Sequence, residues 1–113
     1  MRSSSFIISS IISTAIAAEI KVNYYSDGGC SDYMITVTPP ADWSCYNYDW
    51  TGQNSVGVAS STYPNGTPIC TYYVFADCQG ASQTESGVHN NCASNWGHGF
   101  LSMSCGIEHG LKE

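Results

Sequence analysis

Apolar and polar residues alternate along much of this chain with the two-residue period of β-strands. The clearest segment runs from Ile69 to Phe75, where β-branched and aromatic residues predominate. No segment keeps a helical period over a window of about 11 residues. We therefore expect an all-β protein, with strands over residues 20–25, 32–38, 54–60, 69–75 and 100–105, and with residues 81–85 pairing to 69–75.

Turn-forming residues separate these expected strands. Gly28-Gly29 follows the first strand, and Pro39-Pro40 stops the second because proline cannot donate a ladder hydrogen bond. The segment 54–60 alternates in a way that predicts one buried face. Residues 43–50 are rich in aromatics and are expected to cover one end of the core, whereas residues 87–95 are polar and are expected to form a loop.

The first 18 residues have the pattern of a secretory signal peptide. Arg2 supplies the positive charge, residues 6–16 form a short apolar run, and Ala15, Ala17 and Ala18 supply small residues for cleavage. This run is too short to span a bilayer as a helix. We expect residues 1–18 to be removed and residues 19–113 to form a single cysteine-rich β domain that is secreted and extracellular.

Charge excludes two classes of partner. Removal of Arg2 leaves two lysines against nine carboxylates, a formal charge of about −7. Nucleic-acid binding depends on clustered cations that neutralise phosphates, so it is not expected. The same charge disfavours contact with an anionic membrane, and no stable membrane insertion is expected.

Six cysteines lie beyond the expected signal peptide, an even number in a short exported chain. Such a count predicts three disulfides, because a domain this small gains little stability from its core alone. The chain has no Cys-x-x-Cys pair of the kind that binds metals. The six disulfide-bonded positions are Cys30, Cys45, Cys70, Cys78, Cys92 and Cys105.

The chain also contains an internal repeat. A Tyr-Tyr pair precedes both Cys30 and Cys78, and each of these cysteines is followed by a second cysteine after 15 and 14 residues respectively. Trp50 and Trp96 then follow at similar distances, which favours a structural role for both. We interpret the domain as two copies of one unit, joined near residues 62–69.

The spacing Tyr73-x4-Cys78-x-Gly80-x-Ser82 resembles the Greek-key signature of the βγ-crystallin superfamily. The family has an aromatic residue where this chain has Cys30 and Cys78. The resemblance implies a folded hairpin in which Tyr73 packs across the corner, Gly80 adopts a conformation that other residues resist, and Ser82 hydrogen-bonds back onto the turn.

The first copy departs further from that signature, because Asp32 stands where the glycine is expected. In size and export the chain is similar to the small disulfide-bonded, crystallin-like antimicrobial and killer-toxin proteins of plants, yeasts and streptomycetes. The resemblance spans about residues 20–107 and implies a small disulfide-stapled sandwich of two Greek keys. Another disulfide-stapled β-sandwich or barrel is the alternative.

Six cysteines permit 15 connectivities, and the repeat suggests one of them. If each copy closes on itself, the pairs are Cys30–Cys45 and Cys78–Cys92, which leaves Cys70–Cys105.

Members of the crystallin family often bind Ca²⁺ through two adjacent Asn or Asp residues followed by Ser or Thr. Residues 90–95 resemble that motif, with Asn95 in place of its last serine. Ca²⁺ prefers six to eight oxygen ligands including carboxylates, and this stretch has none. We expect a polar loop tied down by its disulfide, and no metal or other cofactor.

No group of residues predicts catalysis. Of the three histidines, His98 lies between Gly97 and Gly99 and could be exposed, but no Gly-x-Ser-x-Gly or His-x-x-x-His pattern accompanies it. We expect His89, His98 and His109 to be surface or structural residues. We expect no enzymatic activity; a small secreted hydrolase that uses His98 is the weakest alternative.

The candidate contact residues are Tyr46, Tyr48 and His98, since exposed tyrosines can stack on sugars. Asn65 begins an Asn-Gly-Thr sequon in a turn and is a candidate glycosylation site.

Together these features predict a secreted, non-enzymatic effector or toxin-like protein. It would act on a host, as a virulence factor, or on a competing microbe. The expected partner is an extracellular protein receptor or a glycan, contacted by a monomer. The alternative is an extracellular module that binds glycans of a cell wall.

Overall fold

The computed structural model describes residues 18–48, 55–89, 91–94 and 99–109. These residues form an all-β domain in which every strand pairing is antiparallel. The strands are β1 (Ile20–Tyr25), β2 (Tyr33–Val37), β3 (Asp42–Asn47), β4 (Ser55–Ser61), β5 (Thr67–Phe75), β6 (Gln79–Ser86), β7 (Ala93–Ser94) and β8 (Ser102–Glu108). A short 3-10 turn, Ala76–Cys78, joins β5 to β6.

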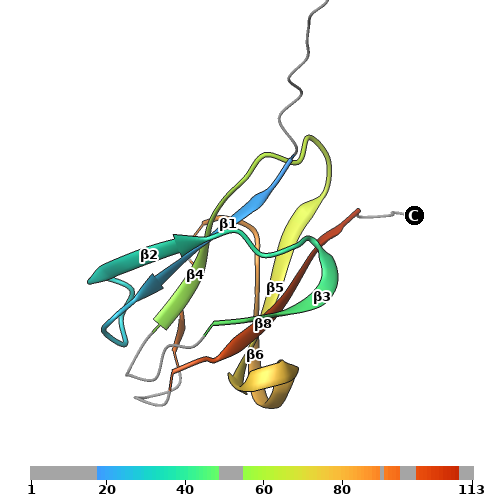
Figure 1. Cartoon of the computed structure of the whole chain (residues 1–113). Helices are drawn as coiled ribbons and strands as arrows, with labels where there is room; N and C mark the ends of the chain where they lie inside the picture. The colour runs from blue at the N-terminus through green and yellow to red at the C-terminus, as the bar shows by residue number, and fades with distance from the viewer. Residues whose placement is uncertain (1–17, 49–54, 90, 95–98, 110–113) are drawn as a thin grey trace, which may run out of the picture.

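Two four-stranded sheets form the two layers of the domain (Figure 1). The strand order is β2-β1-β4-β7 in one sheet and β3-β8-β5-β6 in the other. Each sheet therefore contains three strands from one half of the chain and one strand from the other half. The strands β1, β2, β3 and β4 can be matched to β5, β6, β7 and β8 respectively. With this matching the two sheets have the same strand order, except that each contains the β3 or β7 strand of the other half.

The expected strands are confirmed, and two further strands were not predicted. β3 lies where we expected an aromatic cover for the core, and β7 lies in the expected polar loop. β3 is an edge strand that is mostly exposed, and β7 has only two residues, so neither shows apolar alternation. β4 is buried at each position from Ser55 to Val58, and not on one face as expected; Asn91 lies against Gly57 and covers it.

The core lies between the two sheets and is built from inward-facing residues of both. Tyr24 and Tyr72 occupy matched places on β1 and β5, and both are fully buried. The other buried apolar residues are Ile20, Val22, Val37, Val56, Val58, Cys70, Ala93, Phe100, Met103 and Cys105.

All six cysteines are disulfide-bonded, as predicted, but two of the three predicted pairs are wrong. The pairs are Cys30–Cys92, Cys45–Cys78 and Cys70–Cys105. The exchange of β3 and β7 explains the error, since it carries each second cysteine to the opposite sheet, beside the first cysteine of the other half.

Cys70–Cys105 is confirmed. It joins residues that lie directly opposite each other on β5 and β8. In the other sheet the matching places are taken by Val22 and Val58, which are also directly opposite each other and buried. A buried disulfide in one half thus occupies the position of a valine pair in the other.

Candidate binding surface

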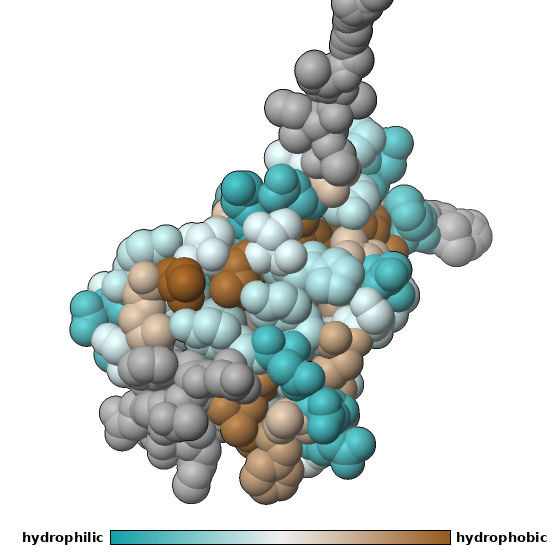
Figure 2. All heavy atoms as spheres, viewed as in Figure 1, coloured by the Kyte–Doolittle hydropathy of each residue, from teal (hydrophilic) through white to brown (hydrophobic). Residues whose placement is uncertain are grey.

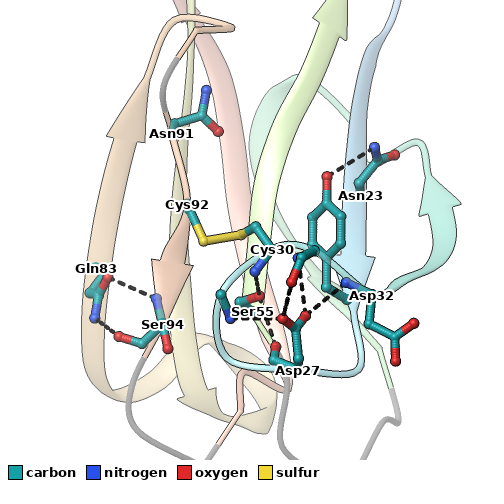
Figure 3. Close-up of a disulfide and its surroundings, with 12 residues drawn as sticks. Asn23, Asp27, Cys30, Asp32, Ser55, Gln83, Asn91, Cys92 and Ser94 are labelled. Carbon is teal, nitrogen blue, oxygen red and sulfur yellow. Dashed lines mark hydrogen bonds between the residues drawn. A yellow bond between two sulfur atoms is a disulfide. The ribbon is translucent and has the colours of Figure 1, made fainter.

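The turns after β1 and β5 are held by the same arrangement of hydrogen bonds. In the first, the Cys30 amide donates to the Ser55 hydroxyl (2.8 Å), which donates to the Asp27 carbonyl (2.9 Å) (Figure 3). In the second, the Cys78 amide donates to the Ser102 hydroxyl, which donates to the Phe75 carbonyl. We call each set of two bonds a serine clasp.

Both serine clasps hold a cysteine in the left-handed backbone region. Cys30 and Cys78 each have a φ of 57°, a conformation that costs a non-glycine residue energy unless its surroundings impose it. The serines responsible are fully buried. Ser82, expected to hold the second turn, lies exposed on β6 opposite Tyr73, so that expectation is wrong.

Asp27 organises the first turn through its carboxylate. It accepts hydrogen bonds from the Ser31 hydroxyl (2.5 Å) and from the backbone amides of Gly29, Ser31 and Asp32. These donors stabilise the charged form and lower the pKa of Asp27 to about 2, with the Ser31 hydroxyl contributing most.

Tyr46 and Tyr48 were expected to be exposed contact residues, but both are partly buried. Both pack against the core, and the ring centroid of Tyr48 lies 4.4 Å from that of Tyr24. Both rings therefore contribute to core packing and do not form an exposed contact surface. His98, Trp50 and Trp96 lie outside the described residues.

The other predicted positions lie apart from one another in the chain and make separate contacts. Asn65, His89 and His109 are exposed. The Asn91 side chain accepts a hydrogen bond from the Val58 amide (2.6 Å) and donates to the Gly87 carbonyl, so it links Gly87 to β4. Asn90 and Asn95 lie outside the described residues.

Aromatic side chains on the surface were missed by sequence reasoning. Among the described residues, Tyr33, Trp43 and Phe75 are 58%, 50% and 60% exposed. Apolar surface occurs as separate patches among hydrophilic ones in Figure 2. The aromatic excess of the chain was visible in its composition, but exposure depends on strand faces and bulges that the sequence does not reveal.

Tyr33 is held in a polar network on the outer face of β1 and β2. A bulge between Tyr24 and Tyr25 brings Tyr33 opposite Tyr25, with their rings edge to face at 6.4 Å. Thr36 donates to Asn23 (2.6 Å), so the Tyr33 hydroxyl must be the donor in its 2.8 Å contact with Thr36.

Trp43 is the most constrained of the three exposed aromatics. Its φ is 72°, and its indole lies on Gly106, where any Cβ would overlap the ring. Ser104 on β8 donates to the Trp43 carbonyl (2.8 Å). The two residues that flank Trp43 are also linked, because the Ser44 amide and hydroxyl both donate hydrogen bonds to the Asp42 carboxylate. These bonds lower the pKa of the Asp42 carboxyl.

Neither a metal centre nor a spanning helix is present in the described residues. They contain no group of three or more His, Cys, Asp or Glu side chains placed to hold a metal ion. No helix within them is long and apolar enough to cross a membrane.

Comparison of the chain with protein-family models, curated proteins and solved structures finds no match.

Proposed function

We propose that this chain is a secreted, non-enzymatic protein of the effector or toxin type, which acts by binding an extracellular target on a host or a competing microbe. The observation that carries the proposal is the set of exposed aromatics, Tyr33, Trp43 and Phe75, on a scaffold joined by three disulfides. Large rigid aromatics lose little conformational entropy on binding, and they are enriched at binding surfaces.

Three disulfides support the extracellular part of the proposal, because such bonds persist in oxidising compartments. The apolar N-terminal segment, read as a signal peptide, supports it independently. The acidic surface favours a protein receptor or a neutral glycan over nucleic acid or an anionic membrane.

We also propose a distant relationship to the βγ-crystallin superfamily. Two observations support it: the matched serine clasps at Ser55 and Ser102, and the exchange of β3 and β7 between two sheets of the same strand order. Both make the halves of the chain equivalent, as two copies of a Greek-key unit would be.

The proposal is tested with the purified, oxidised protein lacking residues 1–18. It would be infiltrated into host tissue and spotted on lawns of competing microbes, beside a variant carrying both Tyr33→Ala and Trp43→Gly. We expect a tissue response or growth inhibition from the parent protein and a loss of potency in the variant. A parent protein inactive in both assays would contradict the effector and toxin roles.

The alternative is a module that binds the glycans of a cell wall without harming any target. Trp43 favours it, because one face of an indole laid on a sheet remains available for stacking. Retention on a polysaccharide together with inactivity in tissue and on lawns would select this alternative.

A further inference from the structure

The outer face of the sheet β3-β8-β5-β6 carries a surface that none of the predicted contacts uses. Inward-facing residues of β5 and β8, such as Cys70 and Cys105, are buried in the core. Their neighbours in each strand therefore face outward, because side chains alternate along a strand. Gly106 on β8 is one of these outward positions, and the indole of Trp43 covers it.

A row of hydroxyl side chains crosses this outer face beside the indole. Ser104 on β8 lies opposite Thr71 on β5, and Thr71 lies opposite Thr84 on β6, with the two threonine hydroxyls 2.9 Å apart. Ser104 and Gly106 are two residues apart on β8, so the row lies about 7 Å from the covered glycine. Gly106, Ile69 and exposed Ser86 form a second row across the same three strands, because Ile69 lies opposite both of the others.

The position of Trp43 is imposed by its surroundings. A bulky residue at a φ of 72° is strained, and such strain persists where neighbouring contacts over-determine it. Here the contacts are the Ser104 hydrogen bond to the Trp43 carbonyl, the Ser44–Asp42 turn, and a glycine that leaves room for the ring. The indole is thus pre-organised, with one face on the sheet and about half of its surface exposed.

We propose that Trp43 and the hydroxyl row Ser104–Thr71–Thr84 form a binding site for a neutral glycan chain. The site rests on the proposed binding role but requires no toxicity. A pyranose ring has an apolar face of C–H groups and a rim of hydroxyls, and it matches an exposed aromatic face bordered by hydroxyl donors and acceptors.

Charge selects neutral over acidic sugars. Asp42 lies next to Trp43, and hydrogen bonds from Ser44 stabilise its ionised form. A carboxylate at this place accepts hydrogen bonds from sugar hydroxyls and repels uronates, sulfates and phosphates. The excess of acidic over basic residues in the chain acts in the same direction.

A protein partner fits this surface less well. Protein hot spots are clustered anchors in pockets that exclude water, whereas the outward-facing residues beside Trp43 are mostly short hydroxyls, with Ile69 opposite Gly106. A protein ligand is therefore an outcome of the test and not part of the proposal.

The test uses the oxidised protein without residues 1–18 and four insoluble polysaccharides: chitin, β-glucan and mannan as neutral ligands, and cross-linked alginate as an acidic one. We expect retention on at least one neutral ligand and none on alginate. Trp43→Gly removes the ring while relieving the strained backbone, and it should weaken retention about tenfold with an unchanged disulfide set. Gly106→Ala keeps the indole but displaces it from the sheet, and it should weaken retention similarly.

Ile35→Ala is the control, because it removes an exposed apolar side chain from β2 in the opposite sheet and lies outside the set of exposed aromatics. We expect it to be retained like the parent protein. Failure of the parent to bind any neutral polysaccharide overturns the site, as does undiminished retention of Trp43→Gly or loss of retention by Ile35→Ala alone. Parent retention without activity on tissue or lawns leaves the site intact and removes only the effector and toxin roles.

Discussion

Single residues in unusual backbone conformations mark the turns of this domain. Gly80 was expected at positive φ from the Tyr73-x4-Cys78-x-Gly80 spacing, and its φ of 87° confirms it. Gly57 lies in β4, where the extended backbone by itself would admit alanine. A Cβ at this position would nevertheless lie 2.6 Å from the Asn91 carbonyl oxygen, which the sequence could not place beside β4.

Gly80→Ala should destabilise the domain by about 1–3 kcal/mol, because a Cβ is costly at this φ. The added Cβ would also meet the Phe75 ring at 2.5 Å. Gly29→Ala is the control, since Gly29 is not at positive φ and its nearest contact is an ordinary 3.5 Å. Thermal melts of both oxidised variants measure the difference, and equal melting temperatures would contradict the prediction.

The Asp27 carboxyl should make the domain sensitive to strong acid. Its pKa is lowered from the ordinary value to about 2 by hydrogen bonds that exist only in the folded state. Its contribution to stability is then complete above about pH 4 and is lost as the pH falls toward 2. Asp27→Asn should flatten this part of the pH–stability profile, and an unchanged profile would show that the carboxylate contributes nothing.

At the scale of elements, the exchange of β3 and β7 is the feature that the sequence did not predict. The internal repeat matches Cys30 to Cys78 and Cys45 to Cys92, but it does not say whether each unit closes on itself or on its neighbour. Hydrophobic patterning could not decide this, because an exposed edge strand and a strand of two residues have no apolar period.

The two serine clasps should contribute equally to the stability of the domain. Ser55→Ala and Ser102→Ala each leave a cysteine amide and a carbonyl without their partner hydroxyl. Each change should cost about 1–3 kcal/mol, the penalty for unsatisfied buried polar groups. Ser86→Ala, at an exposed position on β6, should change stability by less than about 0.5 kcal/mol. Denaturant unfolding compares the three.

If Ser102→Ala were as mild as Ser86→Ala, the serine clasp would not be what holds Cys78 in the left-handed conformation.

The candidate binding surface also depends on the arrangement of strands. The position of Trp43 is set by the start of β3, by the Ser104 hydroxyl on β8 and by Gly106 beneath the indole. Ser104 and Gly106 are distant from Trp43 in sequence, which is why the sequence predicts Tyr46 and Tyr48 as contacts and not Trp43.

At the scale of the whole molecule, the all-β class was predictable because the alternation, the turn residues and the lack of a helical period all favour it. The centre of the sandwich was not predictable. Tyr24 and Tyr72 bury their hydroxyls without a hydrogen-bond partner among the described residues, and burial raises the pKa of both well above the ordinary value.

Buried neutral tyrosines predict a loss of stability in alkali. The unfolded chain releases these protons near pH 10 and the folded chain does not, so stability is complete below about pH 10 and falls above it. The double variant Tyr24→Phe/Tyr72→Phe should show a shallower decline and no loss of stability at pH 7, because it removes unpaired buried hydroxyls. Melts from pH 7 to 11 measure both effects, and parallel profiles would contradict the prediction.

The crossed disulfides have a consequence for the response of this domain to proteases. Cys30–Cys92 and Cys45–Cys78 both join the first half of the chain to the second. A protease that cuts the mostly exposed connection at residues 62–66 breaks the polypeptide, yet two covalent bridges still hold the fragments in register. The nicked protein should migrate as one band until a reductant is added. Separation of the two fragments thus requires two different chemistries, hydrolysis of a peptide bond and reduction of two disulfides.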